Sequence, residues 1–191
     1  CEKNSDFLKA DEILLKGRRV NYRLPDELAT VWCAHVEFLL RTNKFDQALA
    51  LIEDAITPIN VKVDNTNTSD ASNIQEKLHH CRKQIYQNQR VWNLYLDLQE
   101  NLSTLDGVRA TYEQAISLRV ASPQTILNYA LYLEENKYFE ESFRAFEKGV
   151  SLFSFPHVLP IWKAYLSKFI QRYKGTKLER ARDLFEECCE T

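Results

Sequence analysis

The chain has 191 residues, a net charge of −2 and 27% charged residues, a balance typical of folded globular proteins rather than disordered ones. Its 4 glycines and 5 prolines disfavour β-sandwiches and Rossmann-like folds, because those folds use glycine at turns and in phosphate-binding loops. The nearly neutral charge excludes an overall electrostatic binder of nucleic acid, so an RNA contact would have to be a local patch. No apolar run reaches the length of about 18 residues that a membrane-spanning helix needs, and no membrane partner is expected.

Apolar residues recur at spacings of three, four and seven along most of the chain, which predicts amphipathic helices that each bury one face. Helix starts are marked by Ser122 before Pro123, and by a capping box at 176–179. In chain order, we predict helices near 7–20, 26–43, 45–57, 74–102, 105–119, 123–136, 139–151, 158–173 and 177–190.

Two complementary patterns alternate along these helices and predict that they pair into hairpins. In the first pattern an apolar residue is followed three residues later by an aromatic residue or histidine. In the second, a small or apolar residue is followed by a larger apolar one, an acid and another small residue. Because these positions recur in every hairpin, a core role is favoured over base stacking for Trp32, Trp92, Tyr95, Tyr112, Tyr129, Phe146, Trp162, Tyr165 and Phe185.

The predicted fold class is all-α, a right-handed α-α superhelix that forms a TPR-like solenoid of helical hairpins. A single array would contain a half repeat at 1–20 and repeats at about 26–57, 74–119, 123–151 and 158–190. The polar stretch 60–73 has too few large apolar residues to pack and is predicted to be a mobile insert. The apolar stripe after it predicts either a backward extension of the next helix or a separate short helix.

Nothing in the sequence predicts catalysis or a cofactor. Nucleotide-binding, metalloprotease and serine-hydrolase motifs are absent from the sequence, so we expect neither an enzyme nor a small-molecule substrate. A metal is not expected at His79, His80 and Cys81, because adjacent helical positions point in different directions.

Two basic clusters and one aromatic link are the candidate contact surfaces. The first cluster has four basic residues within 74–90, namely Lys77, Arg82, Lys83 and Arg90. The second has six basic residues against one acidic residue within 168–182, and its candidate partner-binding residues are Lys168, Arg172, Lys174 and Lys177. A solvated face is the simpler interpretation of both clusters, and for the second the alternative is a docking point for an acidic protein or an RNA backbone. The link 153–160, with two prolines, is either packing between hairpins or an exposed aromatic contact.

The repeats lack the glycine that TPR motifs place after their Trp and Leu. The frame of Trp92 and Tyr95 with Glu100, followed by Arg109, Tyr112 and Ala115, resembles the half-a-TPR (HAT) repeat of RNA-processing proteins. The resemblance narrows in NYALYLEENKYFEESFRAFEKGVSLF (128–153), IWKAYLSKFIQRY (161–173) and KLERARDLFEE (177–187). These stretches are similar to the Syf-type pre-mRNA splicing factors, the family known in animals as XPA-binding protein two.

This resemblance implies a non-enzymatic, nuclear scaffold of the spliceosome that acts in pre-mRNA splicing and mRNA processing. It further implies binding among the NineTeen-complex proteins and near the intron-binding helicase Aquarius. Family members are longer arrays, so the chain is expected to be a fragment, and the insert at 60–73 departs from the family. Two alternatives remain open: an RNA-binding helical-repeat protein, and a HAT scaffold of another RNA-processing complex, in polyadenylation or ribosome biogenesis.

Overall fold

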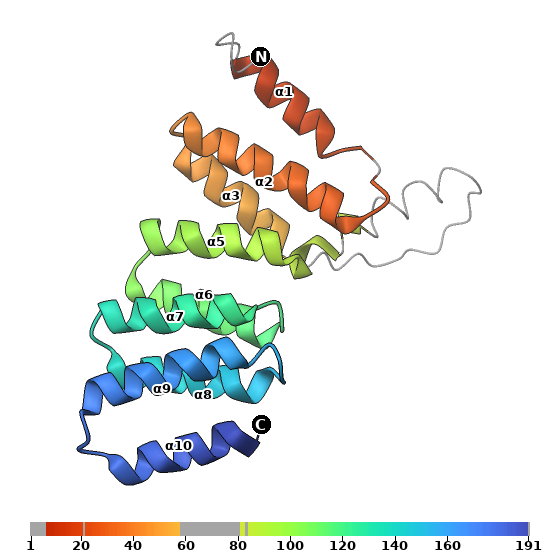
Figure 1. Ribbon diagram of the computed structural model, residues 1–191. Coiled ribbons are helices and arrows are strands. Elements are labelled where there is room, and N and C mark those ends of the chain that lie inside the picture. The colour runs from red at the N-terminus through yellow and green to blue at the C-terminus, as the bar shows by residue number, and fades with distance from the viewer. Residues whose placement is uncertain (1–6, 21, 58–80, 83, 191) are drawn as a thin grey trace. The chain divides into compact units, whose positions relative to one another are not determined.

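A computed structural model describes residues 7–20, 22–57, 81–82 and 84–190 (Figure 1). Within these ranges the chain forms α-helices and one short 3-10 helix, and no β-strand. None of the described helices is both long and apolar enough to cross a membrane. The chain divides into two compact units, Cys1–Val120 and Ala121–Thr191. The predicted all-α fold class is thereby confirmed.

The described residues of unit 1 form two helical hairpins and one further α-helix. Its elements are α1 (Phe7–Gly17), α2 (Pro25–Arg41), α3 (Phe45–Ile56), η2 (Ile85–Gln87), α5 (Gln89–Leu102) and α6 (Leu105–Ser117). Helix α2 packs against α3, and α5 packs against α6, as the alternating patterns predict. Helix α1 packs on α2, and α3 contacts both η2 and α5, so consecutive hairpins are in contact within the unit.

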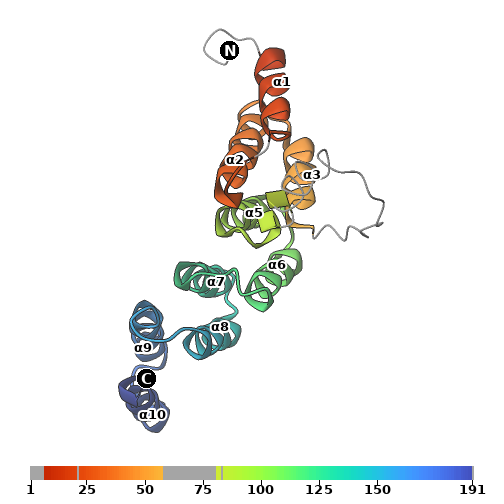
Figure 2. The same ribbon diagram turned by 90° about the vertical axis from the view of Figure 1, so that its right-hand side faces the viewer.

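Unit 2 contains two further hairpins, formed by α7 (Pro123–Glu135), α8 (Phe139–Leu152), α9 (Leu159–Tyr173) and α10 (Leu178–Glu190). Helices α7 and α8 make the most extensive contact, and α9 packs against both of them. Helix α9 contacts both α8 and α10, and in both views α10 lies below α9 (Figures 1 and 2). The observed helices of both units lie within a few residues of the predicted ones, with one exception.

The exception is the predicted helix 74–102, which is not continuous. Residues 81–82 and 84 are helical, but Asn88 has an extended backbone with φ −79° and ψ 121°. Its side chain accepts a hydrogen bond from the Arg90 N–H at 3.0 Å and so caps α5, which begins at Gln89. Backward extension of the helix is therefore wrong. The insert predicted at 60–73 lies outside the described residues.

The two predicted helix starts in unit 2 have different outcomes. Ser122 and Thr125 form a capping box at the start of α7, which confirms the Ser-Pro signal. The box predicted at 176–179 does not form, and the Thr176 hydroxyl instead donates to the Tyr173 carbonyl at 2.7 Å. The carbonyl of Lys177 then accepts the first helical bond of α10, from the Ala181 N–H at 3.0 Å. The helix therefore starts one residue later than predicted.

The hairpin turns explain how a chain so poor in glycine can fold. Asn43 follows α2 with φ 59°, and Lys137 follows α7 with φ 69°, so both are left-handed. In each turn the next N–H, of Lys44 or Tyr138, bonds a carbonyl in the last turn of the preceding helix at 2.9 or 2.8 Å. This bond is typical of a helix end that is usually occupied by glycine. Residues with a Cβ therefore take positions that glycine would fill at lower cost.

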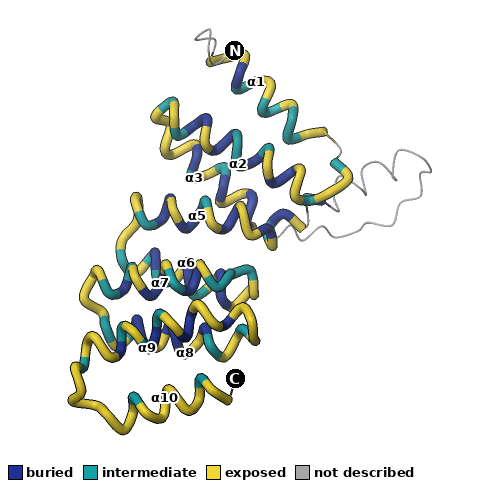
Figure 3. The backbone as a smooth tube through the Cα atoms, viewed as in Figure 1, coloured by how far each residue is buried: buried dark blue, intermediate teal, exposed yellow. Residues whose placement is uncertain are grey.

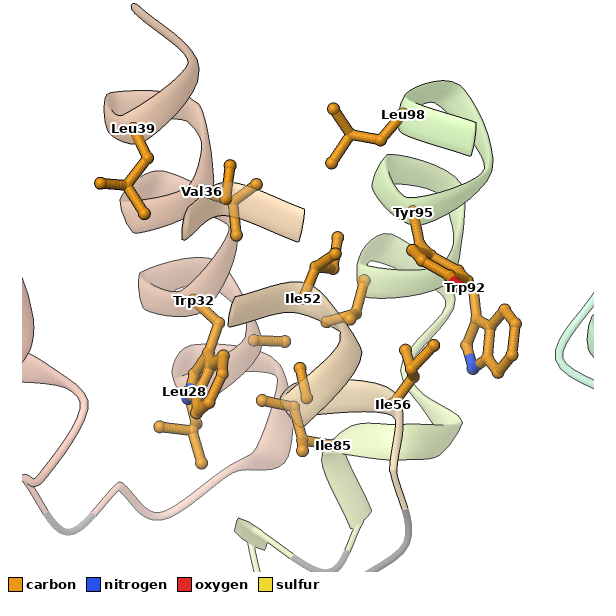
Figure 4. Close-up of a cluster of buried hydrophobic side chains, with 14 of the residues drawn as sticks. Leu28, Trp32, Val36, Leu39, Ile52, Ile56, Ile85, Trp92, Tyr95 and Leu98 are labelled. Atoms are coloured by element: carbon orange, nitrogen blue, oxygen red, sulfur yellow. The ribbon is translucent and has the colours of Figure 1, made fainter. Parts of the chain in front are cut away.

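The core of unit 1 gathers side chains from α2, α3, η2 and α5 (Figure 4). Trp92 and Tyr95 meet edge to face with ring centroids 5.9 Å apart. The indole N–H of Trp92 donates to the Tyr86 carbonyl at 2.6 Å. This bond satisfies the one polar atom that burying the indole would otherwise leave without a partner.

The core of unit 2 depends on a close approach of three helices at Gly149 of α8. A Cβ built there would lie 2.6 Å from Cγ2 of Ile126 on α7 and 3.3 Å from side-chain atoms of Ile161 on α9. Nearby, the rings of Phe146 and Tyr165 stack with centroids 5.5 Å apart. The small residue at the end of the second repeat pattern thus allows neighbouring helices to approach, as predicted.

Eight of the nine predicted core residues are buried, namely Trp32, Trp92, Tyr95, Tyr112, Tyr129, Phe146, Trp162 and Tyr165. The prediction is wrong for Phe185, whose side chain is 45% exposed. Adjacent helical positions point about 100° apart, and in α10 it is Leu184, one residue earlier, that is buried. Helix α10 therefore presents Leu184 to α9 and turns Phe185 away, and most of α10 is exposed (Figure 3).

Candidate partner-binding surface

The second basic cluster lies beside a groove in unit 2. Lys168 and Arg172 are four residues apart on α9 and therefore share one face, and Lys174 ends the helix in a left-handed conformation with φ 42°. The groove has a volume of about 500 Å³ and lies among α7, α8 and α9. We call it the α9 groove, and its lining residues are Glu134, Phe139, Ser142, Phe143, Lys168, Gln171, Arg172 and Lys174.

The floor of the α9 groove is held rigidly by buried contacts. The Ser142 hydroxyl donates to the Ala130 carbonyl of α7 at 2.8 Å, which fixes the first turn of α8. The ring of Phe143 packs against Phe169 and Tyr173, with centroids 5.5 and 5.8 Å away. The groove therefore combines an aromatic floor with cations supplied by α9 and its C-terminal turn.

The four candidate residues differ in how their charges are used. Lys168 lies 2.8 Å from Glu134, and Lys177 lies 3.9 Å from the ring centroid of Tyr173, outside the groove lining. The Arg172 guanidinium lies 3.9 Å from the ring centroid of Phe139. Among the described residues, no carboxylate lies within 4.0 Å of Arg172 or Lys174. Two of the four candidates therefore line the groove with charges that no carboxylate neutralises.

Other members of the basic cluster also pair with carboxylates, and one of these, Glu147, lies outside the segment 168–182. Arg180 lies 3.3 Å from Glu147 of α8, and Arg182 lies 3.1 Å from Glu179. Glu147 also accepts a hydrogen bond from the Tyr165 hydroxyl at 3.1 Å. Burial raises the pKa of Tyr165, and the negative charge of Glu147 raises it further, so the hydroxyl stays protonated as a donor.

Two acids late in the first helices of their hairpins, Glu100 and Glu134, bond residues of neighbouring helices. Glu100 accepts a hydrogen bond from the Tyr112 hydroxyl of α6, and Glu134 pairs with Lys168 of α9. Glu100 therefore links the two helices of one hairpin, whereas Glu134 links consecutive hairpins.

The described part of the first basic cluster serves the packing of unit 1. Arg82 lies 2.7 Å from Asp54 and stacks over Trp32, with its guanidinium carbon 4.1 Å from the ring centroid. Arg90 donates to the Thr30 hydroxyl at 2.9 Å. Lys77 and Lys83 lie outside the described residues.

The remaining candidates from the sequence are the three residues considered for a metal site and the aromatic link 153–160. His79 and His80 lie outside the described residues, whereas Cys81 is buried and its thiol donates to the Tyr22 carbonyl at 3.3 Å. In the aromatic link, Val158 is buried but Phe155 is 68% exposed. The link therefore contributes packing at Val158 and leaves Phe155 as an exposed aromatic side chain.

Sequence reasoning missed a second groove, of about 390 Å³, between α2 and α5 in unit 1. Its charged lining residues are Glu37, Arg90 and Asp97, and burial raises the pKa of Asp97. These residues come from helices that are far apart in the sequence, so neither helix alone signals the groove.

Comparison with known proteins identifies the family. The family model described as "Pre-mRNA-splicing factor Syf1/CRNKL1 C-terminal HAT repeat" matches residues 1–191. The chain is 43% identical over 187 residues to the "Pre-mRNA-splicing factor syf1 homolog" of Drosophila melanogaster, covering 98% of this chain and 20% of that protein. Identity is 42% over 186 residues to human "Pre-mRNA-splicing factor SYF1", covering 97% of this chain and 21% of that protein. For "Pre-mRNA-splicing factor cwf3" of Schizosaccharomyces pombe it is 40% over 188 residues, covering 98% and 23%.

The chain thus spans about a fifth of the length of these relatives. The match extends over the whole chain, and the helical hairpins of both units have the architecture that a HAT repeat requires. The predicted resemblance is confirmed: this chain belongs to the Syf1/CRNKL1 family of HAT-repeat pre-mRNA-splicing factors.

Proposed function

We propose that the chain is part of a non-enzymatic scaffold of the spliceosome, which acts in pre-mRNA splicing in the nucleus. The observation that carries this proposal is the family match over the full chain, together with relatives at 40–43% identity that are named pre-mRNA-splicing factors. The resemblance further proposes protein partners among the NineTeen-complex members and the intron-binding helicase Aquarius.

The scaffolding mechanism would be geometrical. Within each unit, a hairpin buries one face against its neighbour and leaves the other side chains for partners, so an array of hairpins can hold several proteins at once. A binding role for the α9 groove is supported by its mixture of aromatic floor and cations. The ion pair between Lys168 and Glu134 holds both side chains at the wall of the groove.

The proposal is tested by reversing the four candidate residues, Lys168, Arg172, Lys174 and Lys177, to glutamate in the full-length protein. We expect recovery of splicing-complex proteins from nuclear extract to fall in a salt-sensitive way, because charge at an exposed surface steers association. A matched control reverses four exposed cations elsewhere in unit 2, Lys137, Arg144, Lys148 and Lys163, and should leave recovery unchanged.

The melting temperature of both variants should stay within a few degrees of the unchanged protein. All four control cations and three of the four candidates are exposed, and the ion pair that is lost, between Lys168 and Glu134, is about one third exposed. Equal recovery of every partner at low and at moderate salt would contradict the proposal. Loss of RNA in place of proteins would instead favour the RNA-binding alternative, for which affinity falls steeply with salt.

A further inference from the structure

We propose that the α9 groove receives an acidic segment of a partner protein, in which a carboxylate is followed closely by an apolar side chain. This inference rests on the proposed function and specifies the chemistry of one partner. The carboxylate would be bound by Arg172 and Lys174, and the apolar side chain would pack toward Phe139 and Phe143.

The orientation of Arg172 is the first argument. Its guanidinium carbon lies 3.9 Å from the ring centroid of Phe139, so the planar group covers one aromatic face. Stacking holds the guanidinium in place, and the N–H groups along its edge can still bind a carboxylate in two parallel hydrogen bonds. A prepositioned arginine loses less side-chain entropy on binding than a freely rotating one.

Lys174 supplies the second cation of the groove. It occupies the C-terminal cap of α9 with φ 42°, and its N–H bonds the Ile170 carbonyl at 2.9 Å, so its backbone is fixed beside the groove. Gln171, one residue before Arg172, adds an amide that can donate to a second carboxylate oxygen. Two cations and an amide suit one or two carboxylates.

The same charges argue against an RNA backbone as the occupant. Glu134 places a carboxylate in the groove wall and already holds Lys168 at 2.8 Å. An RNA backbone carries one phosphate per nucleotide, so it would bring several negative charges toward Glu134 and only two cations free of carboxylates. A short acidic peptide can place its carboxylate at Arg172 and keep its other groups away from Glu134.

The size and lining of the groove fit a peptide segment. Its volume of about 500 Å³ lies within the range of about 300–1,000 Å³ typical of specific binding pockets. Phe139 is half-buried and Phe143 is buried at its floor, so an apolar side chain entering the groove would displace water from aromatic carbon. Charge complementarity and an aromatic floor together define the acidic and apolar pattern that we propose.

The test measures binding of a short fluorescein-labelled peptide, in which Asp alternates with Leu, to the intact 191-residue chain by fluorescence polarisation. We expect saturable binding that weakens about tenfold or more in the double variant R172Q and K174Q, since each charge-assisted hydrogen bond contributes substantially to affinity. The matched variant K163Q, at an exposed position of α9 outside the groove, should bind like the unchanged chain.

A gain of affinity provides the sharper test. The variant E134Q removes the carboxylate from the groove and frees Lys168, so it should bind the acidic peptide several-fold more tightly. Tighter binding by this variant cannot result from damage to the fold, because such damage would weaken binding. The same peptide with Asn in place of Asp, and an oligouridylate RNA, should bind poorly to every variant.

Three results would overturn the inference: an absence of saturable binding to the unchanged chain, equal binding by R172Q/K174Q, or oligouridylate binding as tight as the peptide. Failure of the proposed function is distinguished by the recovery experiment in nuclear extract. Partner recovery that depends on the four cations without binding of the peptide would refute only the acidic segment. Peptide binding without any effect on recovery would refute the role of this surface in splicing complexes.

Discussion

Replacing Gly149 with alanine tests the close approach of α7, α8 and α9. The added Cβ would lie 2.6 Å from Cγ2 of Ile126, well inside van der Waals contact, and 3.3 Å from two atoms of Ile161. Ile126 is fully buried and β-branched, so its methyl group cannot rotate away without moving α7. Overpacking of this kind costs about 1–3 kcal/mol.

Helix propensity opposes this cost, because alanine is favoured over glycine within a helix by about 1 kcal/mol. The contact at 2.6 Å is severe, so we expect overpacking to dominate and the free energy of unfolding to fall by about 1–2 kcal/mol. Urea unfolding followed by tryptophan fluorescence would measure this loss at an unchanged m-value.

The matched control is Gly107→Ala in the first turn of α6. The nearest atom to its Cβ is the Ser103 hydroxyl, the free end of a rotatable side chain. Here the propensity gain should prevail, and stability should stay the same or rise by up to about 1 kcal/mol. If Gly149→Ala were as stable as the unchanged chain, the three helices could not approach as closely as the glycine contact requires.

Four further changes test other parts of the fold. Trp162→Ala should lower the free energy of unfolding by about 3–5 kcal/mol in urea, and a loss below about 1 kcal/mol would show that the indole is not in the core. Burial raises the pKa of Tyr165, so the folded protein holds the phenol proton more tightly than the unfolded chain does. The contribution of this group to protein stability is therefore fully present below the unfolded pKa of about 10, and it is lost as the pH rises above that value. The Tyr165→Phe variant should therefore lose less stability between about pH 9 and pH 11 than the unchanged chain, and parallel pH profiles in thermal melts would contradict this. Lys137→Gly should raise the melting temperature, because it relieves a left-handed conformation that costs about 1 kcal/mol, and a lower one would show that the side chain matters more. Phe155→Ser should change stability by less than about 0.5 kcal/mol, and a larger loss in urea would mean that the ring is packed.

The helical hairpins were predictable because each helix buries one face, and burial leaves a periodic trace in the sequence. The tryptophans that lead the repeat frames are all buried, and so are Tyr112 and Phe146 of the second pattern. Where the pattern failed, two apolar residues were adjacent. Leu184 and Phe185 fit a helix equally well, and the packing of α9 decides which of them is buried.

The break before α5 had a signal that the apolar stripe obscured. Asn88 is a favoured N-cap residue, and its side chain bonds the backbone two residues later. The stripe continued through Ile85, which is buried in the 3-10 turn, and therefore appeared to belong to one helix. Apolar periodicity reports burial, and it does not register a change of direction between two buried elements.

The candidate surface was predictable only in part, because charges that meet in space are distant in the sequence. The basic residues within 168–182 are neighbours along the chain and stood out at once. Two of their acidic partners, Glu134 and Glu147, lie on α7 and α8, outside this segment. A count of charges within one segment therefore overstated the positive charge and could not reveal the groove.

Helix α10 buries little of its surface, so it can open locally without disturbing the residues of the α9 groove. Leu184 is the one buried residue of α10, whereas α8 buries five, so detaching α10 exposes little apolar surface. The ion pair of Arg180 with Glu147 is about half exposed and adds at most about 1 kcal/mol. Local opening of α10 should thus need far less free energy than opening of α8, and its amides should exchange with solvent earlier. Arg172 and Lys174 belong to α9 and its cap, so they keep their places during such opening, while Lys177 moves with the fluctuating helix.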